Sequence, residues 1–315
     1  MSIPVVSIIT VAYNHEKYIA KCIESVLSQD VDFKIEMIIG EDCSTDQTRS
    51  IIKMYEAKYP EIIKPIYNDN NLGGRENYIN VVKKAQGKYT AHLDGDDYML
   101  PRKLSLQVEY MENNADIAMS GHGIRMEDSD GNIVSEQINH LKLESGKAND
   151  FLKYGAYIAN VSVMCRRNFL DIELFDRLHK LRHGDLLIHM IVSRNGGVGY
   201  IDQVLSVYRK HSMGVSSIAL DSVENRLNTL TAQINILDKA HLLNIDARAI
   251  SFARTQLNLN VGFFMLKRNE KRYALIYFIK ALTLYLRGVL FYRLIIGNGK
   301  LTILFTKFLN WHRGL

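Results

Sequence analysis

Cysteine, proline and tryptophan are scarce in this sequence. Three cysteines among 315 residues, with no Cys-x-x-Cys pair, are too few for a disulfide framework or a cysteine-rich zinc site. We expect them to be buried and reduced, as in a cytoplasmic protein. Of the four prolines, none follows Pro101, so no proline interrupts the helical pattern over residues 221–315.

Export and membrane-spanning signals are also lacking. The N-terminus has no basic segment followed by the long apolar run of a signal peptide. No stretch reaches the ~18 uncharged apolar residues of a membrane-spanning helix. With 47% hydrophobic and 23% charged residues, the composition is that of a globular protein rather than a disordered or collagen-like one. The length predicts two domains, or one enlarged α/β domain with an appendage.

Acidic residues are nearly absent from the last part of the chain. Residues 1–250 hold 28 Lys and Arg against 33 Asp and Glu, whereas residues 251–315 hold 11 basic residues and one acid, Glu270. The formal net charge of +5 therefore combines a slightly acidic body with a strongly basic tail. Such a division indicates that the two regions face different partners.

Strands and helices alternate over the first 113 residues. Short β-branched runs predict strands, and apolar residues at helical spacing predict the helices between them. This alternation is typical of βαβ units with a mostly parallel sheet. The expected strands are 5–11, 35–40, 62–67 and 89–93, and the expected helices are 16–29, a segment around 51–55, 76–85 and 101–113.

Polar clusters follow the first, second and fourth predicted strands. Ligands of open α/β sheets bind beyond the carboxyl ends of the strands, so these clusters should meet in one site. The densest, Asp94-Gly95-Asp96-Asp97, has three carboxylates that repel one another unless a cation neutralises them. A divalent ion that also holds phosphates fits this pattern, and a solvated acidic turn is the alternative.

Four segments follow one another along the chain: Val6-Ser7-Ile8-Ile9-Thr10-Val11-Ala12-Tyr13-Asn14, Ile23-Glu24-Ser25-Val26-Leu27-Ser28-Gln29, Glu41-Asp42-Cys43-Ser44-Thr45-Asp46 and Leu93-Asp94-Gly95-Asp96-Asp97. In this order they resemble the family 2 glycosyltransferases of GT-A fold, over roughly residues 4 to 215. The resemblance implies a Rossmann-like, mostly parallel central sheet flanked by helices. We expect a catalytic domain at 1–220, with a nucleotide-binding half at 1–115 and an acceptor half at 116–220, and a helical C-terminal region at 221–315.

The resemblance assigns the nucleotide-sugar site residue by residue. Tyr13 would pack on the base, Asp42 would bond the base imide, and Arg75 would contact the nucleotide. The alternatives are a core position for Tyr13, a helix cap for Asp42 and a solvated surface charge for Arg75. The remaining positions implied for the donor are Val11, Asp94, which would face the ribose, Gly95 and Asp96.

A metal site and a catalytic base are implied in the same way. Asp96 would coordinate Mg²⁺ or Mn²⁺, with Asp97 close enough to share the role. The segment from Tyr208 to Ser217 resembles a family segment whose histidine closes over the site, so His211 becomes a metal or diphosphate ligand. Asp185 would be the general base, although Gly184 stands where the family usually has Glu, and a helix N-cap is its alternative role.

Basic residues recur every six or seven positions in the apolar tail. A helix keeps such residues roughly on one side, which is typical of a basic amphipathic helix in an anionic membrane interface. Packing of this region, amphipathic from about residue 265, on the catalytic domain or in a homodimer is the alternative. The large apolar face argues against nucleic acid. The basic residues are Lys280, Arg287, Arg293, Lys300 and Lys307.

The sequence therefore predicts a metal-dependent inverting glycosyltransferase at the inner face of the cell membrane. Its donor would be a nucleotide-diphosphate sugar, with UDP-sugars favoured, and its acceptor a glycan or lipid-linked hydroxyl in surface-polysaccharide synthesis. A catalytically inactive sugar-nucleotide-binding or membrane scaffold protein is the alternative. A sugar-1-phosphate nucleotidyltransferase is less favoured, because no glycine-rich phosphate loop follows the first strand.

Overall fold

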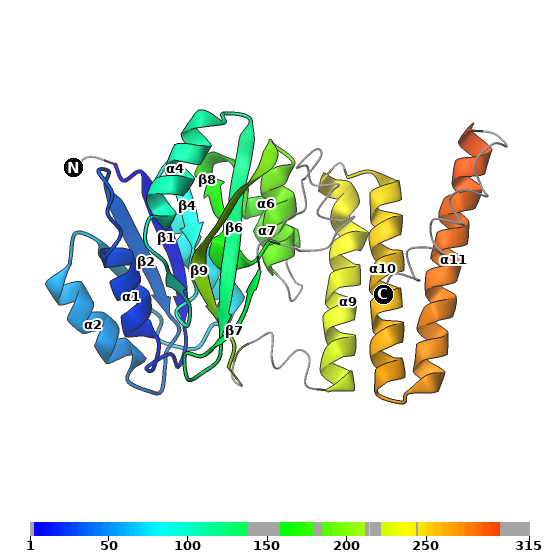
Figure 1. The fold of residues 1–315 in the computed structure, drawn as a ribbon, viewed down its shortest axis with the longest axis horizontal. Coiled ribbons are helices and arrows are strands. Elements are labelled where there is room, and N and C mark those ends of the chain that lie inside the picture. Colours follow the sequence, from blue (N-terminus) through cyan, green and yellow to red (C-terminus); the bar gives the residue numbers. More distant parts are fainter. Residues whose placement is uncertain are drawn as a thin grey trace. The chain divides into compact units, whose positions relative to one another are not determined.

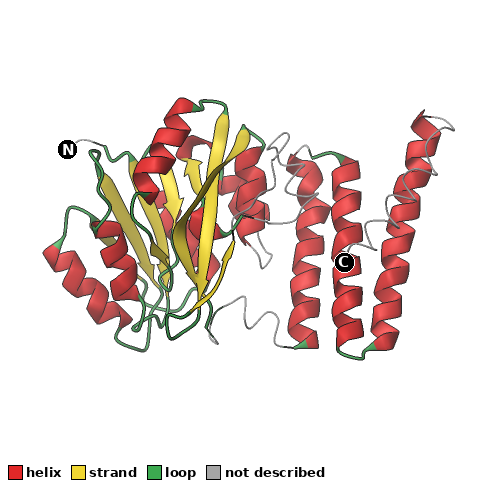
Figure 2. Ribbon diagram, viewed as in Figure 1, coloured by secondary structure: helices red, strands yellow, loops and turns green. Residues whose placement is uncertain are grey.

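The computed structural model describes residues 3–137, 158–178, 184–211, 214, 222–243 and 245–296. The chain divides into two compact units, residues 1–244 and 245–315. The predicted domain boundary at residue 220 stays a prediction. Figure 1 labels the elements of both units along the chain, and Figure 2 distinguishes their helices and strands.

The first unit is built on one sheet whose strand order is β3-β2-β1-β4-β8-β6-β9-β5, with β7 paired to β6. Strands β3, β2, β1 and β4 are all parallel to one another. Strand β8 runs antiparallel to both β4 and β6, so the second half of the sheet is mixed. The strands are β1 Val6–Ala12, β2 Ile35–Glu41, β3 Ile63–Tyr67, β4 Tyr89–His92, β5 Tyr98–Met99, β6 Ile117–Glu127, β7 Ile133–Gln137, β8 Met164–Arg166 and β9 Gly197–Arg209.

Helices join these strands as the alternating pattern predicts. The α/β class, the parallel first half of the sheet and the helical C-terminal region are confirmed. Predicted segments that fall on residues 138–157, 179–183 or 297–315 lie outside the described residues. The helices are α1 Ile19–Leu27, α2 Thr48–Lys58, α3 Gly74–Lys84, α4 Lys103–Asn113, α6 Ile172–Leu178, α7 Gly184–Ser193, α9 Val223–Lys239, α10 Ala247–Lys267 and α11 Lys271–Ile296, with short 3-10 turns at Asn160–Ser162, Arg167–Phe169 and Ala240–Leu243.

Successive residues of β2 face opposite sides of the sheet. Met37 and Ile39 belong to the core that also takes apolar side chains from α1, α2 and α4. Gly40 faces α3, and a Cβ on it would come within 2.1 Å of the Asn77 Oδ1 atom. The Asn77 amide instead donates to the Gly40 carbonyl at 2.7 Å. This close approach holds α3, and the loop before it, against the strand that ends at the candidate site.

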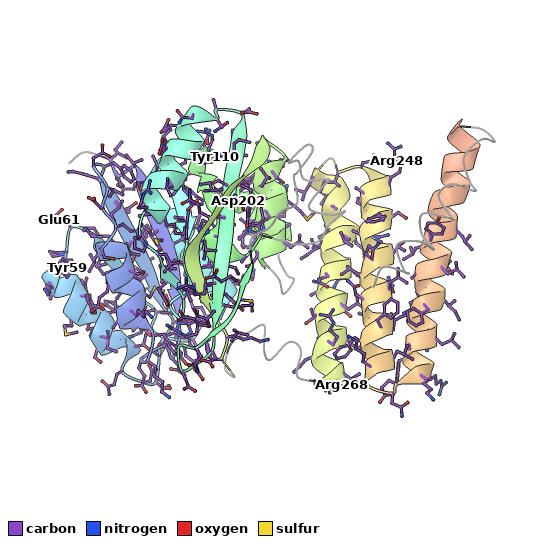
Figure 3. The ribbon with its side chains drawn as sticks, in the orientation of Figure 1. Tyr59, Glu61, Tyr110, Asp202, Arg248 and Arg268 are labelled. Atoms are coloured by element: carbon purple, nitrogen blue, oxygen red, sulfur yellow. The ribbon has the colours of Figure 1, made fainter. Side chains whose placement is uncertain are left out.

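The second unit contains α10 and α11, which pack along each other. Phe278 of α11 lies over Gly262 of α10, where a Cβ would come within 2.5 Å of the ring. The Phe263 and Phe278 rings meet edge to face with centroids 5.2 Å apart. In Figure 3, Arg248 and Arg268 mark the two ends of α10. Among the described residues, no helix is both long and apolar enough to cross a membrane.

Candidate active site

The carboxyl ends of β1, β2 and β4 lie side by side at one edge of the sheet. The backbone N–H of Asp42 donates to the Ala12 carbonyl at 3.0 Å, which carries the pairing of β2 past the end of the strand. The segment after β4 continues along β1, because the N–H of Gly95 donates to the Val11 carbonyl, also at 3.0 Å. The three polar clusters of the sequence are therefore neighbours in the fold.

The turns after β1 and β2 interlock. Asn14 and Cys43 both adopt left-handed backbone conformations, with φ of 56° and 58°. The Asn14 side-chain oxygen accepts from the N–H of Thr45 at 2.9 Å, and the N–H of Asn14 donates to the Ser44 hydroxyl at 3.0 Å. Tyr13 precedes this turn and is 43% exposed, so its ring is available to a ligand and does not belong to the core.

The buried Asp42 carboxylate holds the loop before α3 in place through hydrogen bonds. Its carboxylate accepts from the Asn68 amide at 2.9 Å and from the backbone N–H groups of Leu72 and Gly73 at 2.8 and 2.9 Å. Only 2% of Asp42 is exposed. Gly73 has a φ of +83°, a conformation that favours glycine. The carboxylate predicted to bond the base thus also fixes the loop that carries Arg75.

Arg75 points its guanidinium at carboxylates of the protein. It pairs with Glu76 and, at 3.1 Å, with Asp176 of α6. All three side chains keep contact with solvent, so each of these ion pairs adds little to stability. The nucleotide contact predicted for Arg75 stays a prediction.

Asp96 and His211 meet although 115 residues separate them. The Asp96 Oδ2 atom lies 2.9 Å from His211 Nε2 and 4.0 Å from Nε2 of His15. Burial opposes ionisation of Asp96, but the hydrogen bond to His211 and the charges of both histidines outweigh it and lower its pKa. An ionised carboxylate beside an imidazole is a donor pair suited to a divalent cation.

Asp97 turns into the protein instead. It is 1% exposed, and its Oδ1 atom accepts from the backbone N–H of Arg209 at 2.7 Å. The Arg209 guanidinium donates to the Asp96 carbonyl at 2.7 Å and lies over the Tyr18 ring at 4.6 Å. Asp97 and Arg209 thus hold the acidic turn against β9, which leaves Asp96 as the carboxylate of this turn that meets His211.

Gly95 is required by the packing of the same turn. A Cβ at this position would come within 2.8 Å of His15 Nδ1 and 3.1 Å of both the Val11 carbonyl oxygen and the Ala12 Cβ. A side chain here would push the acidic segment away from β1. Gly95 therefore shapes the place where the donor is expected to bind.

Asp94 and Asp185 lie close enough for the charge of Asp185 to affect the pKa of Asp94. Burial, followed by the charges of Asp96 and Asp185, raises the pKa of Asp94 to about 8. Asp185 lies in the first turn of α7 and keeps contact with solvent, but the surrounding protein strips hydration from its carboxyl and raises its pKa. A raised pKa makes a carboxylate a stronger base, as proton abstraction from a hydroxyl requires.

Two side chains of the described residues, Asp96 and His211, lie close enough together to share a cation. No group of three or more His, Cys, Asp or Glu side chains suited to a metal occurs in the described part of the chain. Mg²⁺ is commonly held by one or two carboxylates together with substrate phosphates and water. Asp96 and His211 fit such a cation, provided that a diphosphate completes its coordination.

Sequence reasoning missed two residues of this site. His15 approaches Asp96, and its position directly after Tyr13-Asn14 at a strand end was the available signal. Tyr78 of α3 places its hydroxyl 3.4 Å from Nε2 of His92 and packs edge to face on Phe175 at 5.9 Å. Burial raises the pKa of Tyr78, and the charges of Asp185 and Asp94 add to this. No motif marks Tyr78 in the sequence.

The fold is that of an α/β protein with a mostly parallel first half of its sheet, and sequence comparison gives its family. The model described as glycosyl transferase family 2 matches residues 7–172. The chain belongs to this family, as the resemblance of its motifs predicted.

Two curated relatives illustrate the match. An uncharacterized protein of Mycobacterium tuberculosis (strain ATCC 25618 / H37Rv) is 32% identical over 212 residues, which cover 66% of this chain and 60% of that protein. TuaG of Bacillus subtilis (strain 168), named for teichuronic acid biosynthesis, is 32% identical over 219 residues, or 68% of this chain and 82% of the relative. The match thus spans less than two thirds of the length of the mycobacterial relative.

Solved structures share the fold at low sequence identity. S. aureus TarS 1–349, solved in complex with UDP-GlcNAc, has a TM-score of 0.54 at 17% identity, covering 90% of this chain and 92% of that one. The mannosyltransferase PcManGT from Pyrobaculum calidifontis, solved with GDP-Man and Mn²⁺, has a TM-score of 0.55 at 14% identity, covering 94% and 82%. These likenesses confirm the GT-A type of fold.

Proposed function

We propose that the chain is an inverting glycosyltransferase (EC 2.4, hexosyltransferase class) of cell-surface polysaccharide synthesis. It transfers a sugar from a nucleotide-diphosphate sugar, a UDP-sugar in the first place, to a hydroxyl of a glycan or lipid-linked acceptor. The observation that carries this proposal is the grouping of the Asp96–His211 pair with Asp94 and Asp185 in a family 2 chain. The UDP-GlcNAc bound by TarS and the name of TuaG support the donor and the pathway class.

The proposed chemistry is a single displacement. The acceptor hydroxyl oxygen forms a bond to the anomeric carbon while the bond from that carbon to the diphosphate oxygen breaks. The bonding electrons leave with the nucleoside diphosphate, and the hydroxyl proton passes to the Asp185 carboxylate. Asp185 is suited to this step because it has contact with solvent and a raised pKa.

Donor binding involves the other residues of the site. Tyr13 stacks on the base, Asp42 fixes the base-side loop, Val11 and Gly95 bring the backbone close to the nucleotide, and Asp94 faces the ribose. Asp96 and His211 would hold Mg²⁺ or Mn²⁺, which offsets the charge of the leaving diphosphate. The Mn²⁺ in the PcManGT complex supports a divalent cation in this fold.

We also propose that the second unit attaches the enzyme to the inner face of the cell membrane. Helix α11 exposes an apolar stripe at spacings of four, three and four residues. Lys271 and Arg272, in the first turn of α11, lie beside this stripe on the helix, where they could reach anionic headgroups. The stripe consists of Leu275, Ile279, Leu282 and Leu286, which are 60%, 55%, 52% and 45% exposed.

An Asp185→Asn variant tests the catalytic proposal. Purified full-length protein is screened with UDP-sugars and GDP-mannose in Mg²⁺ or Mn²⁺, with donor binding followed by thermal shift and transfer by nucleotide release. We expect D185N to bind the donor as the wild type does and to lose about 10²–10⁴-fold in transfer rate. Asp202→Asn, which changes an exposed carboxylate of β9 (Figure 3), should leave both unchanged. Equal loss of binding and transfer in D185N would make Asp185 structural, and a wild type that binds no nucleotide sugar would refute the proposal.

A further inference from the structure

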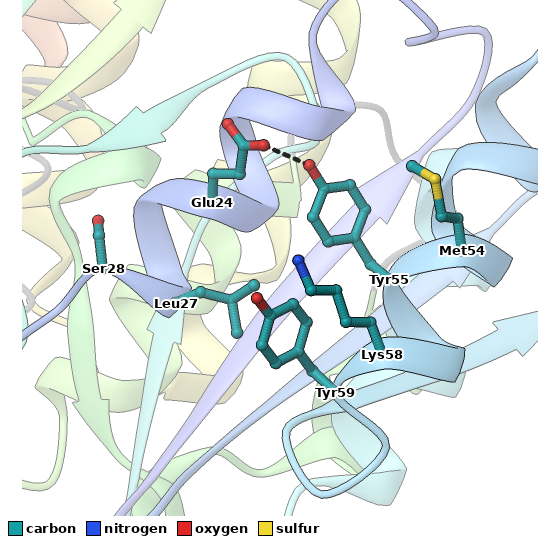
Figure 4. A pocket seen from close by; sticks show the side chains of 7 residues that line it. All are labelled: Glu24, Leu27, Ser28, Met54, Tyr55, Lys58 and Tyr59. Atoms are coloured by element: carbon teal, nitrogen blue, oxygen red, sulfur yellow. Dashed lines mark hydrogen bonds between the residues drawn. The ribbon is translucent and has the colours of Figure 1, made fainter.

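A cavity of about 360 Å³ lies between α1 and α2. Figure 4 shows Tyr55 and Lys58 of α2, with Tyr59 directly after the helix, on one side, facing residues of α1. Its lining combines apolar and aromatic side chains with a few polar groups, as ligand-binding clefts do. The lining residues are Glu24, Leu27, Ser28, Met54, Tyr55, Lys58 and Tyr59.

The cavity is separate from the candidate active site. Helix α2 begins near that site, because its first residue, Thr48, accepts a hydrogen bond from the N–H of His15 at 2.7 Å. Tyr55 and Tyr59 come seven and eleven residues later, which places them about 10–16 Å further along the helix axis. A molecule in the cavity would therefore not occupy the donor position.

Contacts within the protein hold the polar groups of the cavity in position before any ligand binds. The Tyr55 hydroxyl donates to Glu24 Oε1, which fixes the ring across the gap between the two helices (Figure 4). Burial and the Glu24 carboxylate raise the pKa of Tyr55 to about 12, so this hydroxyl stays protonated. The Lys58 ammonium lies 5.2 Å from the centre of the Tyr59 ring, on the rim of the cavity.

This combination suits a saccharide better than other ligands. Sugars present flat C–H faces that pack on aromatic rings, and hydroxyls that bond to carboxylate, ammonium and hydroxyl groups. A nucleotide phosphate would meet the negative charge of Glu24 with one lysine to balance it. A purely apolar ligand would take the charges of Glu24 and Lys58 out of water without offering them a polar contact, which is unfavourable.

We propose that the cavity between α1 and α2 binds sugar units of the acceptor glycan at a distance from the reaction centre. This inference rests on the proposed function, since it assumes a polymeric glycan acceptor. A glycan held at a second point on the same protein is kept at high effective concentration near the active site. The cavity would thus favour long acceptors over short ones.

Calorimetric titration of the full chain with chitohexaose, chondroitin hexasaccharide and mannohexaose tests the proposal. We expect at least one oligosaccharide to bind the wild type, and Tyr59→Ala and Lys58→Ala each to weaken that binding at least tenfold. Tyr59→Phe keeps the ring and should bind nearly normally. Lys53→Ala is the matched control, because Lys53 is exposed on the same helix but lies over the Tyr67 ring, outside the cavity.

Two outcomes would overturn the proposal: no binding of any oligosaccharide by the wild type, or binding that survives both Y59A and K58A. Because Tyr59 is partly buried against the core, its variant is first compared with the wild type in thermal unfolding. Lys58 is exposed, so K58A keeps the test valid if Y59A does not fold. Nucleotide-sugar binding is measured in parallel. Its absence in the wild type would refute the proposed function, whereas its persistence in K58A with lost glycan binding supports the second site.

Discussion

A buried lysine in the first unit shows how burial changes the pKa of a single residue. Lys103, at the start of α4, is fully buried, and its ammonium donates to the Gln107 side-chain oxygen at 2.8 Å. Burial lowers the pKa of Lys103 to about 7. Burial also lowers the pKa values of His92 and His122, and the Lys103 charge lowers both further. These groups are stable together only while they carry little positive charge.

The contribution of Lys103 to stability should therefore rise with pH above 7, whereas Asp94, with its pKa raised to about 8, contributes in the opposite direction. The folded pKa of Lys103 lies below the unfolded value, so between pH 7 and about 10 the unfolded state binds more protons, and folding is favoured as pH increases. Between pH 7 and 8.5 the contribution of Lys103 to the free energy of unfolding should grow by about 1.5 kcal/mol. Urea unfolding of the wild type and Lys103→Met at both values measures it, and K103M should lack this increment. Parallel pH dependence of the two proteins would show that Lys103 titrates normally.

At the scale of elements, one carboxylate joins the end of β2 to the start of α3. Asp42 accepts from the backbone of Leu72 and Gly73, and the loop it holds leads directly into α3 and Arg75. A base-binding role and a loop-fixing role for Asp42 make different predictions. Loss of a base contact alone leaves stability unchanged, whereas loss of the loop contacts takes the acceptor from the Leu72 N–H and one of two acceptors from Gly73 and Asn68.

An Asp42→Ala variant should lower the free energy of unfolding by about 2–4 kcal/mol and also reduce donor binding. Urea unfolding and thermal shift with a nucleotide sugar measure the two effects. Asn71→Ala is the control, because Asn71 also accepts from the Gly73 N–H, at 3.0 Å, but is exposed. It should change stability by less than about 1 kcal/mol. If D42A loses donor binding at wild-type stability, Asp42 acts through the base alone.

Local patterns predicted the elements better than the contacts between them. The β-branched run of β1 and the helical spacing of α1 are local, so the sequence predicted both elements. The parallel order of the strands likewise predicted that the polar clusters after β1, β2 and β4 would meet. The inward turn of Asp97 could not be predicted, because its partner Arg209 is 112 residues away. The same holds for Arg75, whose partner Asp176 lies 101 residues further along the chain.

At the scale of the whole molecule, charge and apolar exposure are distributed unevenly. The first 250 residues carry an acidic excess, and the remaining 65 contain a single acid. In the second unit, α11 buries Ala274 and Ala281 and exposes Leu275 and Ile279. Exposed leucines and isoleucines in register along a basic helix are typical of surfaces that lie in an anionic lipid interface.

An Ile279→Glu variant tests this distribution. In the full chain it places a carboxylate at the centre of the exposed stripe, which opposes insertion among acyl chains and adds repulsion from anionic headgroups. Sedimentation with vesicles of phosphatidylglycerol and phosphatidylcholine should show at least a tenfold loss of binding. Ile133→Glu is the matched control: Ile133 is 60% exposed on β7, compared with 55% for Ile279, and its variant should bind as the wild type does. Wild-type binding should weaken with added salt, because the headgroup attraction is screened. Equal binding of I279E and I133E would assign the stripe to a contact within the protein or between its copies.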